Sequence, residues 1–167
     1  MQMPIVRPVR IPTKGLPWYR RAFKAFAPRK WELIEDYTYT STTLRHSILV
    51  PAPFIFDGAS VPRPLWPFLD PTGLLFIGAL VHDFGYRYRG LLLRTRATLP
   101  WQFERLSRPE IDETMRTIVV EVNDMSVMAG IANAAVRVGG WLAWRNNGRQ
   151  GHRVTEDYPF LMAGATR

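Results

Sequence analysis

Residues 80–87 have the sequence Leu-Val-His-Asp-Phe-Gly-Tyr-Arg, and they give the strongest indication of both fold and function in this chain. It lies within a mostly apolar segment, residues 74–86, of the kind that forms a buried helix. We expect that helix to run from about residue 72 to residue 89. An imidazole and a carboxylate are costly to bury unless neighbouring groups satisfy them. The adjacent pair His82 and Asp83 therefore predicts a functional site as well as a helix.

Segments on both sides of this stretch supply the other expected elements. Ser107 is followed three residues later by Glu110, a capping box that predicts the start of a second helix. A third helix is expected over about residues 125–144, where many small side chains favour close helix packing. Towards the N-terminus, residues 31–40 and 46–56 are rich in the apolar and aromatic residues typical of strands, and we expect them to pair as an antiparallel hairpin.

The predicted fold class is therefore α+β and mainly helical. An antiparallel helix pair carries the histidine and the aspartates, a third helix packs on that pair, and the β-hairpin is small and N-terminal. The basic stretch over residues 90–106 is expected to form an irregular connection between the first two helices.

Length and composition indicate one packed domain. The chain has 167 residues, of which 47% are hydrophobic, which suits one core better than two. We expect a basic arm over residues 1–30, a body over residues 31–147 and a C-terminal tail over residues 148–167. The absence of cysteine excludes a disulfide framework, a thiolate metal site and a cysteine nucleophile. No signal peptide or transmembrane segment is expected, because the N-terminus lacks an apolar run and the third helix contains Asn133 and Arg137.

The positive charge is concentrated in the N-terminal arm. The formal net charge is +8, and residues 1–31 hold eight Lys or Arg and no acidic residue, so the rest of the chain is close to neutral. Such an arm could bind nucleic acid, anionic lipid or an acidic protein surface, or it could be a solvated tail. Aromatic residues interleave with the charges, which favours a membrane interface or a partner groove. The arm residues that we expect to contact a partner are Arg7, Arg10, Arg20, Arg21 and Lys24.

The candidate site combines one histidine with several acidic residues. His82 has an ordinary pKa suited to accepting a proton near neutral pH, and Asp112 in the second helix could hold its other ring nitrogen. Tyr86 follows His82 by four residues, so it lies along the same side of the helix. Asp83 points about a third of a turn away, and with Asp57 and a loop carbonyl it would make an oxygen-rich site suited to Ca²⁺. The alternative is that these groups only tie the helices to a loop.

Several runs of residues carry a resemblance to a known family. They are Val50-Pro51-Ala52-Pro53-Phe54, Asp57-Gly58-Ala59-Ser60-Val61-Pro62-Arg63, His82-Asp83 with Tyr86, and Arg108 with Asp112. With these runs the chain resembles, over about residues 31–144, the domain of unknown function 1353, which is found mainly in tailed phages and prophages. The resemblance implies a phage-encoded protein located in the host cytoplasm before assembly and then in the virion.

Part of this sequence also resembles the prokaryotic and fungal phospholipase A2 pattern, namely Asp57-Gly58-Ala59-Ser60, His82-Asp83-Phe84-Gly85-Tyr86-Arg87, and Arg108 to Asp112. This second resemblance implies a phospholipase A2-like antiparallel helix pair with a calcium cofactor. The implied roles are a general base at His82, an orienting carboxylate at Asp112, a tyrosine bonded to that carboxylate at Tyr86, and a calcium site made by Asp83, Asp57 and the backbone carbonyl of Gly58.

One departure from the lipase pattern concerns a disulfide. In those lipases a cysteine in the loop turn pairs with a cysteine three residues before the histidine. The corresponding residues here are Ala59 and Ala79, which suits a reducing compartment and keeps the loop close to the helix.

Three functional hypotheses remain open at this point. The first is a phospholipase A2-like, Ca²⁺-dependent ester hydrolase that the basic arm brings to anionic lipid at the host envelope. The second is a non-catalytic virion protein of the tail, neck or another assembly, in which the arm contacts other phage proteins. The third is nucleic-acid binding through the arm, which the body supports least because it contains no recognised reader motif.

Overall fold

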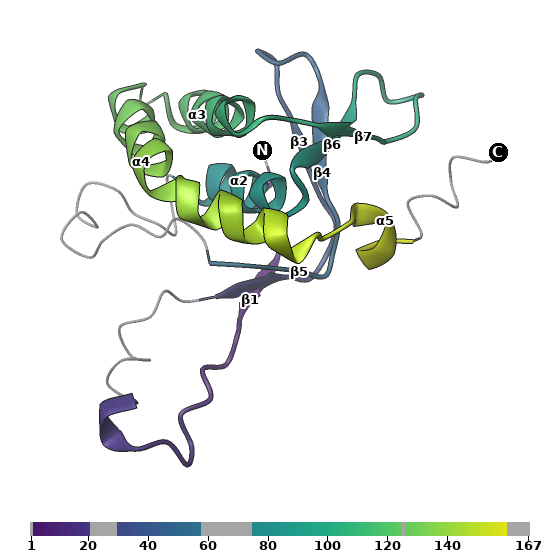
Figure 1. The fold of residues 1–167 in the computed structure, drawn as a ribbon. Helices are drawn as coiled ribbons and strands as arrows, with labels where there is room; N and C mark the ends of the chain where they lie inside the picture. The colour runs from purple at the N-terminus through teal and green to yellow at the C-terminus, as the bar shows by residue number, and fades with distance from the viewer. Residues whose placement is uncertain (1, 21–29, 58–74, 125, 160–167) are drawn as a thin grey trace.

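A central helix, α2 (Phe76–Tyr88), organises the structure. The computed structural model describes residues 2–20, 30–57, 75–124 and 126–159. Within α2 only Asp83 and Arg87 are not buried. The helix lies between helices α3 (Arg108–Asn123) and α4 (Ser126–Gln150) and the β-sheets (Figure 1). This position explains why residues 74–86 are almost continuously apolar.

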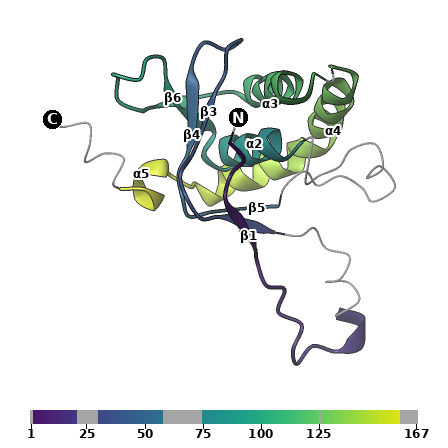
Figure 2. The same ribbon diagram turned by 180° about the vertical axis from the view of Figure 1, so that it is seen from behind.

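Seven strands in the described ranges form two antiparallel sheets, which Figure 2 shows from behind. One sheet has the order β1-β2-β5 and the other has the order β3-β4-β6-β7. The bounds of the strands are β1 (Val6–Pro8), β2 (Trp31–Leu33), β3 (Tyr37–Thr40), β4 (Ser47–Val50), β5 (Phe54–Phe56), β6 (Gly90–Arg94) and β7 (Gln102–Arg105).

The prediction of a mainly helical fold is wrong, because the chain forms a sheet-rich mixed α+β structure. Residues 90–106, which were expected to be irregular, contain β6 and β7, and these strands pair with each other. Strand β6 also pairs with β4, which precedes it by about forty residues in the chain. Such pairing depends on contacts between distant segments, and strands of three to five residues show little periodicity of their own.

The expected hairpin is present as two pairs of strands that share one register. Trp31 lies opposite Phe56 in the three-stranded sheet, and Tyr37 lies opposite Val50 in the four-stranded sheet. Prolines at 51 and 53 interrupt the ladder between them, since proline cannot donate a backbone hydrogen bond. There the Asp36 carboxylate accepts a hydrogen bond from the Ala52 N–H at 2.8 Å. The hairpin is therefore shared between both sheets and is not a small peripheral unit.

Helices α2 and α3 pack closely and run antiparallel. An added Cβ at Gly78 would lie 2.9 Å from Val119, and one at Gly85 would lie 2.8 Å from Ile111. The later glycine of α2 thus contacts the earlier residue of α3, which shows that the two helices run in opposite directions. Gly78 and Gly85 are seven residues apart and lie on the same face of α2, so the backbones of the two helices can approach closely. This approach places the polar residues of both helices within hydrogen-bonding distance.

The chain on either side of the body also contacts it. Strand β1 of the expected arm pairs with β2, and Arg7 forms an ion pair with Glu32 at 2.8 Å. After β1 the chain runs away from the body towards a helical turn over residues 18–20 (Figure 1). At the other end, α5 (Val154–Asp157) leads to Tyr158, whose ring is buried in the main core. In the described ranges, none of the helices combines the length and apolar character needed to cross a membrane.

Candidate functional site

The site is built where α2 faces the first turn and a half of α3. His82 Nε2 lies 3.1 Å from Asp112 Oδ1, and the Tyr86 hydroxyl donates to the same oxygen at 2.6 Å. All three residues are buried. His82 and Tyr86 are four residues apart, so they stack along one face of α2 with ring centroids 4.0 Å apart. The structure therefore joins residues that lie about thirty positions apart in the chain.

The contact with Asp112 fixes which nitrogen of His82 carries the proton. An ionised carboxylate only accepts hydrogen bonds, so the neutral ring must donate through Nε2. Nδ1 then keeps its lone pair. Its nearest carboxylate oxygen, Asp83 Oδ1, lies 3.7 Å away, which is too long for a hydrogen bond. Burial lowers the pKa of His82, but the interactions with Asp112 and Asp83 outweigh burial and raise it above the ordinary value.

Asp112 is held in its ionised form. Burial raises the pKa of this carboxyl, but the hydrogen bonds from His82 and Tyr86 outweigh burial and lower it. Arg108, one turn earlier on α3, places its Nε 3.9 Å from Asp112 Oδ2. The same guanidinium donates to the backbone carbonyl of Arg137 at 2.9 Å, so it links Asp112 to helix α4. Asp112 is thus an anion whose charge is compensated inside the protein.

Asp83 occupies the opposite, more open side of the imidazole. Its side chain is 22% exposed, and among the described residues Oδ2 accepts a long bond of 3.3 Å from the Asp57 N–H. Burial, together with the neighbouring Asp57 carboxyl, raises the pKa of Asp83 to about 7, although His82 opposes the shift. A carboxylate beside a second carboxylate, with weak hydrogen bonds, is an environment that a cation would stabilise.

Five of the six residues predicted to form the site lie in the described part of the chain, and the structure brings them together. His82, Tyr86, Asp112, Asp83 and Asp57 are brought together by α2, α3 and the end of β5. Gly58 lies outside the described residues. Among the residues that are described, no group of three or more His, Asp or Glu side chains is arranged to hold a metal ion. The carboxylate pair alone therefore represents the predicted calcium site.

The predicted partner-binding residues lie on the arm and not at this site. Arg7 is paired with Glu32, while Arg10 and Arg20 are exposed. Arg21 and Lys24 fall within residues 21–29, outside the described part of the chain.

Two contributors to the site, Arg108 and Gly140, have contacts that their positions in the sequence did not specify. Arg108 lies four residues before Asp112, and this spacing is a signal for an ion pair on one helix face. Gly140 of α4 faces Tyr86, because a Cβ at this position would lie 2.6 Å from the tyrosine hydroxyl oxygen. The small residues of this segment indicated close packing, but not which side chain they would meet.

These features define an α+β protein with a buried His–Asp–Tyr cluster beside an open carboxylate pair. The model of one family, described as protein of unknown function (DUF1353), matches residues 31–136. This match spans well over half of the chain and includes every described residue of the cluster, so the protein belongs to the DUF1353 family. Comparisons with curated proteins and with solved structures give no match.

Proposed function

We propose that this protein is a phage-encoded, phospholipase A2-like hydrolase that cleaves a lipid ester with the help of Ca²⁺. The observation that carries the proposal is the asymmetry around His82. Asp112 engages Nε2 at 3.1 Å, while Nδ1 keeps its lone pair on the side of Asp83 and Asp57. A general base needs one nitrogen held and the other available to a reactant.

The chemistry assigned to the protein residues is general acid–base catalysis. His82 Nδ1 takes a proton from water as the water oxygen attacks the ester carbonyl carbon. Asp112, with Tyr86 bonded to it, stabilises the imidazolium that results. The ester C–O bond then breaks, and the proton on Nδ1 passes to the leaving alkoxide. The products are a carboxylic acid and an alcohol, and His82 is neutral again.

The oxygen atoms near Asp83 are of the chemical type that binds calcium. Carboxylate oxygens of Asp83 and Asp57 would hold the ion, with the Gly58 carbonyl as a third donor, and all are hard oxygen ligands of the type that Ca²⁺ prefers. The raised pKa of Asp83, caused by burial and by the adjacent Asp57 carboxyl, supports this assignment. When bound, the ion would polarise the ester carbonyl and stabilise the negative charge that develops on its oxygen.

A second candidate function is a non-catalytic virion protein of the tail, neck or another assembly. The observation that favours it is the arm, which runs away from the body and carries Trp18 with 81% of its surface exposed (Figure 1). In this case the arm would contact neighbouring phage proteins, and the His–Asp cluster would only join α2 to α3. For either candidate we propose a location in the host cytoplasm before assembly and then in the virion, as the resemblance to a family found mainly in phages implies.

An assay of ester hydrolysis separates the two functions. The full chain is incubated with mixed phospholipid vesicles, with Ca²⁺ or with a chelator, and released fatty acid is measured. We expect hydrolysis with calcium, and a fall in kcat of about 10³-fold in His82→Asn, the size of a lost general base. His152→Asn is the matched control, because His152 is exposed and lies outside the His82 cluster, where it contacts Gln150 and the Tyr88 ring.

Two results would count against the enzyme. One is an absence of hydrolysis in the wild type with calcium. The other is hydrolysis that His82→Asn leaves unchanged while thermal melting shows a folded protein.

A further inference from the structure

Helix α4 has an apolar face that no described part of the chain covers. Val127, Ile131 and Trp141 are 73%, 46% and 55% exposed. Together with exposed Ala134, they recur at spacings of four, three and seven residues, so they lie on one side of the helix. The stripe extends over about 21 Å, at 1.5 Å per residue.

The opposite side of α4 is already used for packing. Ala129 is fully buried, and Val136 packs with Met115 and Val119 of α3. Further along, Gly140 contacts Tyr86. A helix that is apolar on both sides is ordinarily covered on both sides, so the stripe indicates a second surface that α4 binds.

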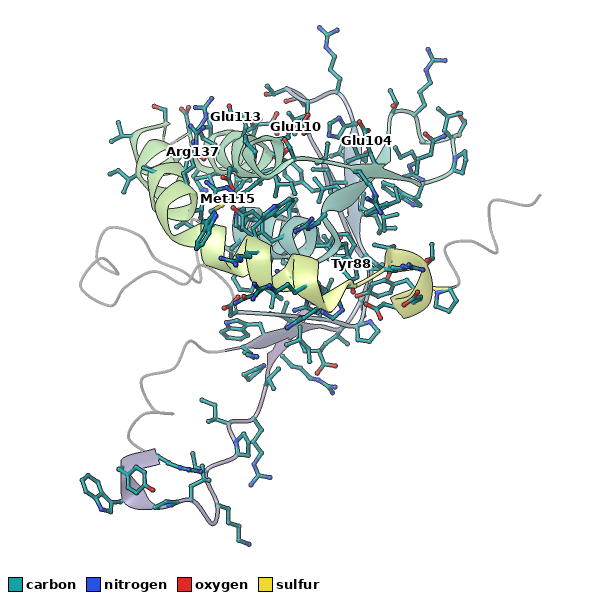
Figure 3. All side chains as sticks on the ribbon, in the orientation of Figure 1. Tyr88, Glu104, Glu110, Glu113, Met115 and Arg137 are labelled. Carbon is teal, nitrogen blue, oxygen red and sulfur yellow. The ribbon has the colours of Figure 1, made fainter. Side chains whose placement is uncertain are left out.

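The charges of α4 favour an anionic surface. The helix contains Arg137, Arg145 and Arg149 and no acidic residue. Arg137 lies beside Glu113 of α3 (Figure 3), where it helps to lower the pKa of that carboxyl. Arg145 lies over the Trp141 ring at 5.4 Å, and Arg149 is exposed one turn further on. Exposed arginines therefore continue the apolar stripe at its C-terminal end.

The described side chains of the stripe offer few of the polar groups that a protein partner would use. Protein interfaces contain about one hydrogen bond per 100–200 Å². Between Val127 and Trp141, the exposed stripe offers aliphatic side chains and one indole. Such a face, flanked by arginine, suits the boundary between lipid headgroups and acyl chains, where Trp and Arg both find partners.

We propose that the Val127–Ile131–Ala134–Trp141 face of α4 docks on an anionic bilayer, with Arg145 and Arg149 contacting lipid phosphates. Lipid docking deepens the proposed function, because it would hold the hydrolase at its substrate. It does not require hydrolysis, so binding and cleavage are separable. Figure 1 shows that the arm and α4 are distinct segments of the molecule, so their contributions can be tested separately.

Binding to vesicles of ether-linked phospholipids tests the proposal, because these lipids have no ester to cleave. The full chain is floated with phosphatidylcholine vesicles, with or without phosphatidylglycerol. We expect binding that depends on phosphatidylglycerol and that falls about tenfold or more in Ile131→Ser/Trp141→Ser, since two exposed apolar side chains lose their burial in lipid. Arg145→Ser/Arg149→Ser should weaken binding and make it less sensitive to salt.

Leu99→Ser is the matched control. Leu99 is 47% exposed, which is close to the 46% of Ile131, but it lies in the β6–β7 connection. Its substitution should leave vesicle binding unchanged. Thermal melting of each variant verifies folding, and because the substituted side chains are exposed we expect melting temperatures close to that of the wild type.

Three outcomes would overturn the proposal. The first is wild-type protein that does not float with anionic vesicles. The second is binding that survives Ile131→Ser/Trp141→Ser and is lost in Trp18→Ser, which would assign docking to the arm. The third is a dimer in sedimentation without vesicles that Ile131→Ser/Trp141→Ser dissociates, which would assign the face to a second copy. Failure of hydrolysis with intact α4-dependent binding would reject the proposed enzyme and leave docking in place.

Discussion

Two carboxylates flank the imidazole of His82, and they differ in how the protein holds their charge. Asp112 is buried, accepts strong bonds from His82 and Tyr86, lies near Arg108 and has a lowered pKa. Asp83 is more open, accepts one long bond and has a raised pKa, because burial and the Asp57 carboxyl destabilise its charge. The comparison shows that two hydrogen bonds and a nearby arginine compensate the charge of Asp112, although its buried Oδ2 accepts no hydrogen bond from the described residues. No Lys or Arg of the described part of the chain forms an ion pair with Asp83.

The largest effect on stability is expected from removing the Asp112 carboxylate. Asp112→Ala leaves the His82 ring and the Tyr86 hydroxyl buried without their acceptor, and we expect the free energy of unfolding to fall by about 3 kcal/mol. Denaturant unfolding measures this change. Asp112→Asn keeps an acceptor oxygen and should lose about half as much. Equal losses in the two variants would show that the hydrogen bonds do not stabilise the fold.

The next largest effect is expected from a substitution in α4 that displaces Tyr86, the tyrosine that donates a hydrogen bond to Asp112. A methyl group at Gly140 would lie 2.6 Å from the Tyr86 hydroxyl oxygen, so Gly140→Ala must displace the tyrosine or the helix. We expect a destabilisation of about 2 kcal/mol. Gly130→Ala is the matched control on the same helix, because nothing lies within 4 Å of an added Cβ there. It should stabilise the protein by up to about 1 kcal/mol, and a similar loss in both variants would contradict the packing argument.

A smaller effect concerns a third carboxylate, Glu121 of α3, which accepts hydrogen bonds at both oxygens and lies nearer the surface than Asp112. It accepts bonds from Tyr39 at 2.6 Å, from Thr42 at 3.0 Å and from the Thr43 N–H at 2.6 Å. Burial raises its pKa, but these bonds outweigh burial and lower it to about 2. Because the pKa is depressed in the folded state, the stabilisation is present above about pH 4.5 and is lost as the pH falls towards 2.

Glu121→Gln tests this pH dependence. At pH 7 we expect a loss of about 1 kcal/mol, reduced by the partial solvent exposure of the group. The difference in melting temperature between wild type and Glu121→Gln should shrink steadily below pH 4.5. A difference that stays constant down to pH 2 would contradict the assignment.

The smallest effect on stability is expected on the open side. Asp83→Asn removes a charge that the fold compensates poorly, so in the absence of calcium the free energy of unfolding should change by about 0.5 kcal/mol or less. Denaturant unfolding in the presence of a chelator measures it. A loss as large as that of Asp112→Ala would show that the two carboxylates are equally structural, and the comparison would fail.

Parts of the fold and the site could be predicted where local sequence dictates structure. Helix α3 begins at its capping box, with the Ser107 N–H bonded to the Glu110 carboxylate at 2.7 Å. The apolar run around His82 forms the expected helix. The cluster of His82, Asp112 and Tyr86 was expected from helical spacing together with a resemblance to a known family, and the structure brings these three residues into contact.

The rest depended on contacts between distant segments. Leu91 to Leu93 form a strand because β4 and β7 lie on either side of them. The sequence did not predict this strand, because a short apolar run has no distinctive period and the basic residues and Pro100 around it are typical of an irregular connection. In the same way, the meeting of Gly140 with Tyr86 depends on how α4 crosses α2, and the spacing of small residues in the sequence does not specify that crossing.

Calcium titration by calorimetry tests the central claim most directly. The claim is that the Asp83 side of His82 accepts a cation, whereas hydrogen bonds from His82 and Tyr86 and the nearby Arg108 already compensate the charge of Asp112. The account predicts that wild-type protein binds one Ca²⁺ and that Asp83→Asn abolishes binding. Asp124→Asn, which removes an exposed carboxylate elsewhere, should bind as the wild type does. No calcium binding by the wild type, or equal binding by Asp83→Asn, would contradict the account.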